Sequence, residues 1–124
     1  MTTRRIALGC AWIGVLFFAF TGAWAFVAPH SFFTTLALYP PYNRHLFHDV
    51  GAFQLGIAAG ILAGIARRPP LAVGLWTGAT AAIVHAVSHW IDRNLGGRSS
   101  DPVLLALFAG LLVAGLIAAE VERR

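Results

Sequence analysis

Four long apolar runs are the feature that most limits what this chain can fold into. They cover residues 6–28, 46–66, 71–91 and 103–119. Each is close to the length, about 20 residues, that a helix needs to cross the hydrocarbon core of a membrane. Hydrophobic residues make up 58% of the chain, charged residues only 11%, and the mean hydropathy is +0.73. We therefore predict an all-α integral membrane protein in which residues 1–124 form one domain, a transmembrane four-helix bundle.

The segment between the first two runs, residues 28–45, is too apolar for a plain solvated loop. It contains Phe32, Phe33 and Leu36, and its prolines lie where helices end or begin. We predict that it forms a short helix or a re-entrant piece lying in the membrane interface. A lid over a lipid-facing pocket is the alternative interpretation.

The arginines predict the orientation. The chain has nine arginines and no lysine. One side of the predicted membrane carries Arg4, Arg5, Arg67, Arg68, Arg123 and Arg124, and the other side carries Arg44, Arg93 and Arg98. This bias predicts a multi-pass protein of the inner or plasma membrane, with both termini in the cytoplasm. Because the arginines punctuate apolar spans, we expect the lipid bilayer, and not nucleic acid, to be their partner.

The first run also has features of a secretory signal peptide. A basic start, an apolar core and the small residues Ala23 and Ala25 occur in the expected order. The run is long for the apolar region of a signal peptide, so we favour a retained helix. Cys10 is the only cysteine and lies within this run, which excludes a disulfide inside the chain.

Ionisable residues are concentrated toward the end of the third run. His85 and His89 are four residues apart and Asp92 follows three residues later, so the three share one helix face. Ionisable groups at membrane depth are costly, and they call for partners or a function.

A second polar group opens the second run, at His45, His48 and Asp49. The second and third runs are joined by a very short turn, residues 67–70, which makes the two helices antiparallel neighbours. The two polar groups should then lie at the same membrane depth. We expect a histidine–aspartate cluster of His45, His48, Asp49, His85, His89 and Asp92 at the outer end of the bundle.

Three kinds of chemistry fit such a cluster. Imidazoles and carboxylates bind transition metals, histidines on facing helices ligate haem, and histidines relay protons near neutral pH. The simplest interpretation, which we favour, is a structural polar cap that needs no cofactor. The stretch HAVSH lacks the glutamate of the H-E-x-x-H motif, and no nucleophile–base pair is visible. We therefore do not expect an enzyme that acts alone.

Two further patterns concern helix packing. Gln54 is expected to form a hydrogen bond between helices, with contact to a ligand as the alternative. Glycines recur every four residues at Gly56, Gly60 and Gly64, and again at Gly74 and Gly78. Such stripes allow helices to approach closely, either inside one bundle or between two copies in a homodimer or with another membrane protein.

The stretch HDVGAFQLGIAAGILAG, residues 48–64, carries a resemblance to a known family. Together with the four-span layout and the long segment after the first span, it resembles the DoxX-like group of small four-helix bacterial membrane proteins. The resemblance implies an association with quinone-linked oxidoreductase complexes, although many members have no assigned activity. The histidine-rich HAVSHWID, residues 85–92, has no counterpart in this resemblance.

These observations favour a small integral membrane protein with a structural or accessory role. One alternative is a metal- or haem-binding subunit of a quinone-linked redox system. Another is a small carrier or a component of a proton-coupled transporter.

Overall fold

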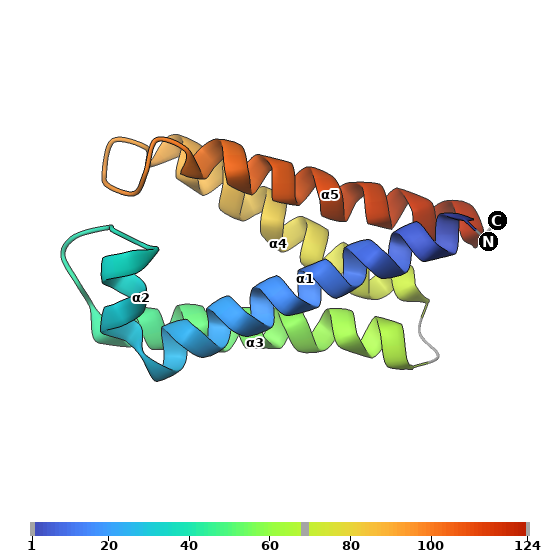
Figure 1. The fold of residues 1–124 in the computed structure, drawn as a ribbon, viewed down its shortest axis with the longest axis horizontal. Coiled ribbons are helices and arrows are strands. Elements are labelled where there is room, and N and C mark those ends of the chain that lie inside the picture. The colour runs from blue at the N-terminus through green and yellow to red at the C-terminus, as the bar shows by residue number, and fades with distance from the viewer. Residues whose placement is uncertain (1, 68–69, 124) are drawn as a thin grey trace.

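The computed structural model describes residues 2–67 and 70–123 and contains five helices. They are α1 (Thr2–Val27), α2 (Pro29–Thr35), α3 (Arg44–Ala66), α4 (Leu71–Ile91) and α5 (Asp101–Glu122), as Figure 1 shows. No strand occurs within the described ranges, so the predicted all-α class is confirmed. The helices α1, α3, α4 and α5 are each long and apolar enough to cross a membrane. The chain therefore has the architecture of a small multi-pass membrane protein.

The helices follow the apolar runs closely. The bounds of α4 match the predicted run, whereas α1 begins at Thr2 instead of residue 6 and α5 extends to Glu122. A short helix, α2, is present in the segment after the first span. The Asn43 side chain starts α3 by accepting hydrogen bonds from the backbone N–H groups of His45 and Leu46, at 3.0 and 3.2 Å. Arg68 and Arg124, which the sequence analysis predicts on the cytoplasmic side, lie outside the described residues, as does Pro69.

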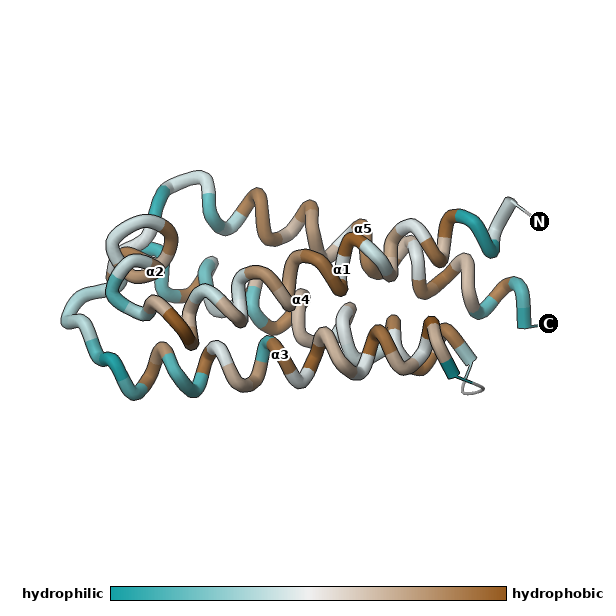
Figure 2. Tube along the Cα trace, turned by 60° about the horizontal axis from the view of Figure 1, so that its bottom comes forward, coloured by the Kyte–Doolittle hydropathy of each residue, from teal (hydrophilic) through white to brown (hydrophobic). Residues whose placement is uncertain are grey.

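The long helices form an up-and-down bundle in which α1 packs against α3 and α5, and α4 packs against α3 and α5. Figure 1 shows that α1 begins and α5 ends at the same end of the bundle. We call this the arginine end, because Arg4, Arg5, Arg67 and Arg123 lie there; the opposite end is the α2 end. In Figure 2 the hydrophilic residues gather toward the two ends. Large apolar side chains such as Leu16, Phe53 and Leu107 are mostly exposed, as expected of residues that face lipid.

Small residues let the helices cross closely. At the arginine end, a Cβ atom on Gly64 of α3 would lie only 3.1 Å from the Cα atom of Gly74 in α4. Nearer the α2 end, a Cβ atom on Gly51 would lie 2.7 Å from the carbonyl oxygen of Gly22 in α1. These contacts support packing within one bundle for part of the predicted glycine pattern. Gly56 has no such contact, because nothing lies within 4 Å of its Cβ position.

Toward the α2 end the pair α1–α3 draws apart from the pair α4–α5, as Figure 1 shows. The helix α2 lies on the α1–α3 pair and is held there by aromatic rings. Phe32 packs edge-on against Trp24 of α1, with ring centroids 5.5 Å apart, and against Phe47 of α3 at 5.9 Å. Tyr42 stacks on Phe47 at 5.8 Å. Aromatic packing therefore fixes α2 to one helix pair only.

Candidate functional site

A cavity of about 400 Å³ lies at the α2 end, where the two helix pairs diverge. Its walls come from all four long helices, from α2 and from the residues after α2. Most of the lining is apolar, including Phe17, Phe32, Phe47, Val50, Leu104 and Leu105. The polar lining residues are Thr21, Tyr39, Gln54, His85, His89 and Asp101. This size, together with apolar walls and a few polar groups, is typical of sites that bind small molecules.

The helix α3 directs one of its faces into the cavity. Leu46, Val50 and Gln54 follow one another at intervals of four residues, so they share one face of the helix, and all three line the cavity. A different face, with His48 and Gly51, is turned toward α1: His48 lies against the ring of Phe26, with centroids 5.2 Å apart. The close crossing at Gly51 fixes this rotation of α3.

The predicted interhelical hydrogen bond of Gln54 is confirmed. Its side-chain amide is hydrogen-bonded to the hydroxyl of Thr21 in α1. The Thr21 hydroxyl also donates to the carbonyl oxygen of Phe17 at 2.7 Å. The atom of Gln54 that contacts this hydroxyl is its carbonyl oxygen, Oε1. Among the described residues the Gln54 NH2 group has no hydrogen-bond partner, so it is available to a molecule in the cavity.

Two histidines lie together on the opposite wall. His85 and His89 are one turn apart on α4, and their ring centroids are 4.8 Å apart. The Nδ1 atom of His89 is hydrogen-bonded to the hydroxyl of Tyr39, at 3.0 Å. His85 lines the cavity, and the structure gives its ring no hydrogen bond to any described residue. Its imidazole is therefore available to a bound molecule.

The last residue of α2 and the residues that follow it are tied to the α4–α5 loop by polar contacts. The backbone N–H of Gly97 donates to the carbonyl oxygen of Leu38 at 2.9 Å, and the Arg98 guanidinium donates to the carbonyl oxygen of Thr35. Gly97 has a φ of 75°, and a Cβ atom there would lie 2.7 Å from the Tyr39 hydroxyl oxygen. Glycine is thus required both by the backbone conformation and by the approach of Tyr39. We call residues 36–43 the strap, because they close one side of the cavity.

The electrostatic surroundings of the strap favour a neutral tyrosine. Burial raises the pKa of the Tyr39 hydroxyl above its ordinary value of 10.0, and the carboxylates of Asp101 and Asp92 raise it further. The Tyr39 hydroxyl therefore keeps its hydrogen, and its bond with His89, at neutral pH.

The structure places the six predicted site residues in different parts of the molecule. His85 and His89 line the cavity, whereas His45 and Asp49 form a separate exposed pair with Nε2 and Oδ2 atoms 3.5 Å apart. His48 faces α1, and Asp92 is the C-cap residue of α4. Within residues 2–67 and 70–123, no group of three or more His, Cys, Asp or Glu side chains is placed to hold a metal ion. Of the six residues that the sequence analysis expected in one cluster, only His85 and His89 line the cavity together. The metal site stays a prediction.

The cavity also contains polar residues that the sequence did not indicate. Thr21 and Tyr39 lie far along the chain from His85 and His89, and no local spacing connects them. Asp101 could have been found from the sequence, because it is an acidic residue just before Pro102, at the start of the fourth span. Its carboxylate accepts a hydrogen bond from the backbone N–H of Arg98 at 2.8 Å.

In comparisons with known proteins, no family model, no curated protein and no solved structure matches this chain. The resemblance to the DoxX-like group therefore stays a prediction.

Proposed function

We propose that this membrane protein binds an amphipathic, membrane-soluble molecule in the cavity at the α2 end. The observation that carries the proposal is the cavity itself: about 400 Å³ of largely apolar space with polar side chains on facing walls. Such a molecule would place its hydrocarbon part among Phe17, Phe47 and Leu104. Its polar head would reach Gln54 and His85.

The polar lining favours a neutral head group. Thr21, Tyr39, Gln54 and the two imidazoles donate and accept hydrogen bonds, and none of the residues that line the cavity is an arginine or a lysine. The carboxylate of Asp101 is engaged by the backbone of Arg98. A carbonyl or hydroxyl head group matches this set of partners, whereas a carboxylate or phosphate would lack a cation.

The role that follows is that of an accessory or carrier protein for such a molecule, with no chemistry of its own. We place the protein in the inner or plasma membrane of a bacterium with both termini in the cytoplasm. The arginine bias supports this orientation.

The proposal is tested with probes that share a decyl chain and differ in head group. We expect decanol and decyl-benzoquinone to raise the thermal midpoint of the purified protein, since a ligand stabilises the state that binds it. Decanoate and decyltrimethylammonium should have a much smaller effect. Gln54→Leu and His85→Leu should reduce the advantage of the neutral probes.

Two tryptophan substitutions provide the matched pair. Val50→Trp fills the cavity and should abolish the stabilisation by decanol and decyl-benzoquinone. Val87→Trp adds the same side chain at an exposed position of α4 and should leave it unchanged. Equal stabilisation of both variants and of the unmodified protein would refute the proposal.

A second candidate is a metal- or haem-binding subunit of a quinone-linked redox system. The paired rings of His85 and His89 on the cavity wall favour it, and the DoxX-like resemblance points the same way. Metal analysis and a visible spectrum of the purified protein, before and after addition of haem, test this candidate. A haem spectrum that is lost in His85→Leu but kept in His45→Leu would replace the first proposal with this one.

A further inference from the structure

A second, smaller pocket lies at the arginine end, about 240 Å³ in volume. Three arginines from separate parts of the fold line it: Arg4 of α1, Arg67 at the end of α3 and Arg123 after α5. Glu122 is its one carboxylate, so the charged residues of the lining carry a net positive charge. Leu8, Ile65 and Leu71 form its apolar wall.

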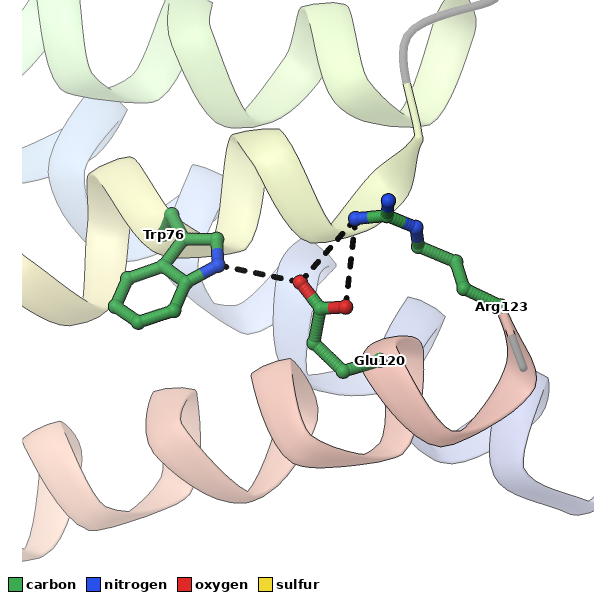
Figure 3. Close-up of polar contacts among 3 residues, drawn as sticks. All are labelled: Trp76, Glu120 and Arg123. Carbon is green, nitrogen blue, oxygen red and sulfur yellow. Dashed lines mark hydrogen bonds and ion pairs between the residues drawn. The ribbon is translucent and has the colours of Figure 1, made fainter.

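Two of the three guanidinium groups have no carboxylate partner among the described residues. Arg123 is held by Glu120, with its Nη1 atom 3.3 Å from both carboxylate oxygens. Figure 3 shows that Glu120 also accepts a hydrogen bond from the indole N–H of Trp76, at 3.2 Å. Within residues 2–67 and 70–123, neither Arg4 nor Arg67 forms an ion pair. The pocket therefore gathers positive charge that these described side chains do not neutralise.

The helix ends do not explain all of this charge. Arg67 and Arg123 follow the C-termini of α3 and α5, where the helix dipole favours cations. Arg4 lies in the first turn of α1, where the dipole is positive and that turn contains no acidic residue. The helix dipole therefore does not account for Arg4, and an anion bound between Arg4 and Arg67 would be stabilised by both guanidinium groups.

We propose that this pocket binds the phosphate group of an anionic phospholipid. The pocket lies at the ends of four helices that are long and apolar enough to cross a membrane, which is the depth of lipid head groups. Guanidinium groups bind phosphate through paired hydrogen bonds. The apolar side chains of Leu8, Ile65 and Leu71 in the lining fit the start of an acyl chain. This site is at the other end of the bundle from the cavity and does not depend on the proposed function.

Native mass spectrometry with defined lipids tests the proposal. The protein, purified in a neutral detergent, is mixed with dioleoyl phosphatidylglycerol or dioleoyl phosphatidylcholine, and the retained lipid is counted. We expect phosphatidylglycerol to be retained about tenfold more than phosphatidylcholine, which corresponds to one strong charge-assisted contact. Inorganic phosphate, added as a third arm, should not displace the bound lipid at millimolar concentration.

The double variant Arg4→Gln/Arg67→Gln should lose the preference for phosphatidylglycerol. The control Arg44→Gln/Arg93→Gln makes the same change of charge at the α2 end and should keep it. If the first double variant does not fold, Arg67→Lys serves instead: it keeps the charge, loses the paired hydrogen bonds and should show a reduced preference. Three results would overturn the proposal: no lipid preference in the unmodified protein, an equal loss in the control, or displacement of the lipid by phosphate.

Discussion

The two ends of the bundle are built from the same four helices but pack in opposite ways. At the arginine end, α3 and α4 approach until a Cβ atom on Gly64 would lie 3.1 Å from the backbone of Gly74. At the α2 end, the same two helices form facing walls of a cavity of about 400 Å³. Close packing of small residues thus secures one end, and the other end retains space.

The difference has a simple origin in the side chains. Between α3 and α4, small residues lie at the arginine end, whereas Gln54, His85 and His89 lie toward the α2 end. Apolar side chains gain little by leaving lipid, so helix association in a membrane depends on close contact and hydrogen bonds. Where bulky and polar side chains hold the helices apart, the space between them can bind a molecule. The substitutions below test this contrast, from the largest expected effect to the smallest.

The largest effect is expected for Gly64→Val, because the added side chain would meet the backbone of Gly74 and force α3 and α4 apart. We expect a loss of about 3 kcal/mol or more in the free energy of unfolding, at the upper end of the cost of overpacking. Gly56→Val places the same change on the same helix where nothing lies within 4 Å. Reversible unfolding in mixed detergent measures the loss in free energy of unfolding for both variants. Similar losses would contradict the close packing of α3 and α4 at the arginine end.

A second pair compares the same truncation at two sites on α5. Leu112 is completely buried between the helices, whereas Leu104 lines the cavity and is 59% exposed. Leu112→Ala should cost about 2–3 kcal/mol, because the contacts of a packed side chain are lost and a void remains. Leu104→Ala should cost less than about 1 kcal/mol, since its surroundings are already open. Equal costs in the same unfolding assay would mean that the α2 end is packed as tightly as the core.

The third prediction concerns the strap. The variant Tyr39→Phe/Arg98→Gln removes the bond to His89 and the side-chain contact with Thr35. Global stability should fall by only about 1 kcal/mol, because aromatic contacts still hold α2 to α1 and α3. Exchange of decyl-benzoquinone, followed by quenching of tryptophan fluorescence, should become faster. An unchanged exchange rate would show that the strap does not close the cavity.

The smallest effect is a dependence on alkaline pH. Because burial and the nearby carboxylates raise the pKa of Tyr39 above 10.0, folding favours the protonated hydroxyl. The stability that the protonated Tyr39 hydroxyl contributes to the folded protein is present in full below about pH 10. It is lost as the pH rises through the raised pKa of Tyr39. The thermal midpoint of the unmodified protein should therefore fall more steeply above about pH 10 than that of Tyr39→Phe. Parallel curves for the two proteins would contradict this assignment.

The sequence predicted the helices well and the site only in part. Charge-free apolar runs leave a chain in lipid little choice but helix, so the spans were predictable. The shared face of His85 and His89 followed from their spacing, and the interhelical bond of Gln54 followed from its position within an apolar run. These features depend on a single helix and its surroundings.

The rotation of α3 could not be read from its own residues. Both of its faces carry polar groups, and the one that meets α1 is fixed by the close crossing of Gly51 and Gly22. That crossing turns His48 away from the cavity and directs Leu46, Val50 and Gln54 into it. Tyr39 was equally hard to predict, because it reaches His89 through a segment with few regular hydrogen bonds.

The most direct test of the cavity as a binding site is native mass spectrometry of the protein released from the membranes in which it is made. We predict that the unmodified protein and Val87→Trp each retain one neutral, lipophilic molecule per chain, and that Val50→Trp does not. Retention of the same neutral molecules by all three proteins would contradict the account, whereas an anionic phospholipid retained by all three belongs to the arginine end.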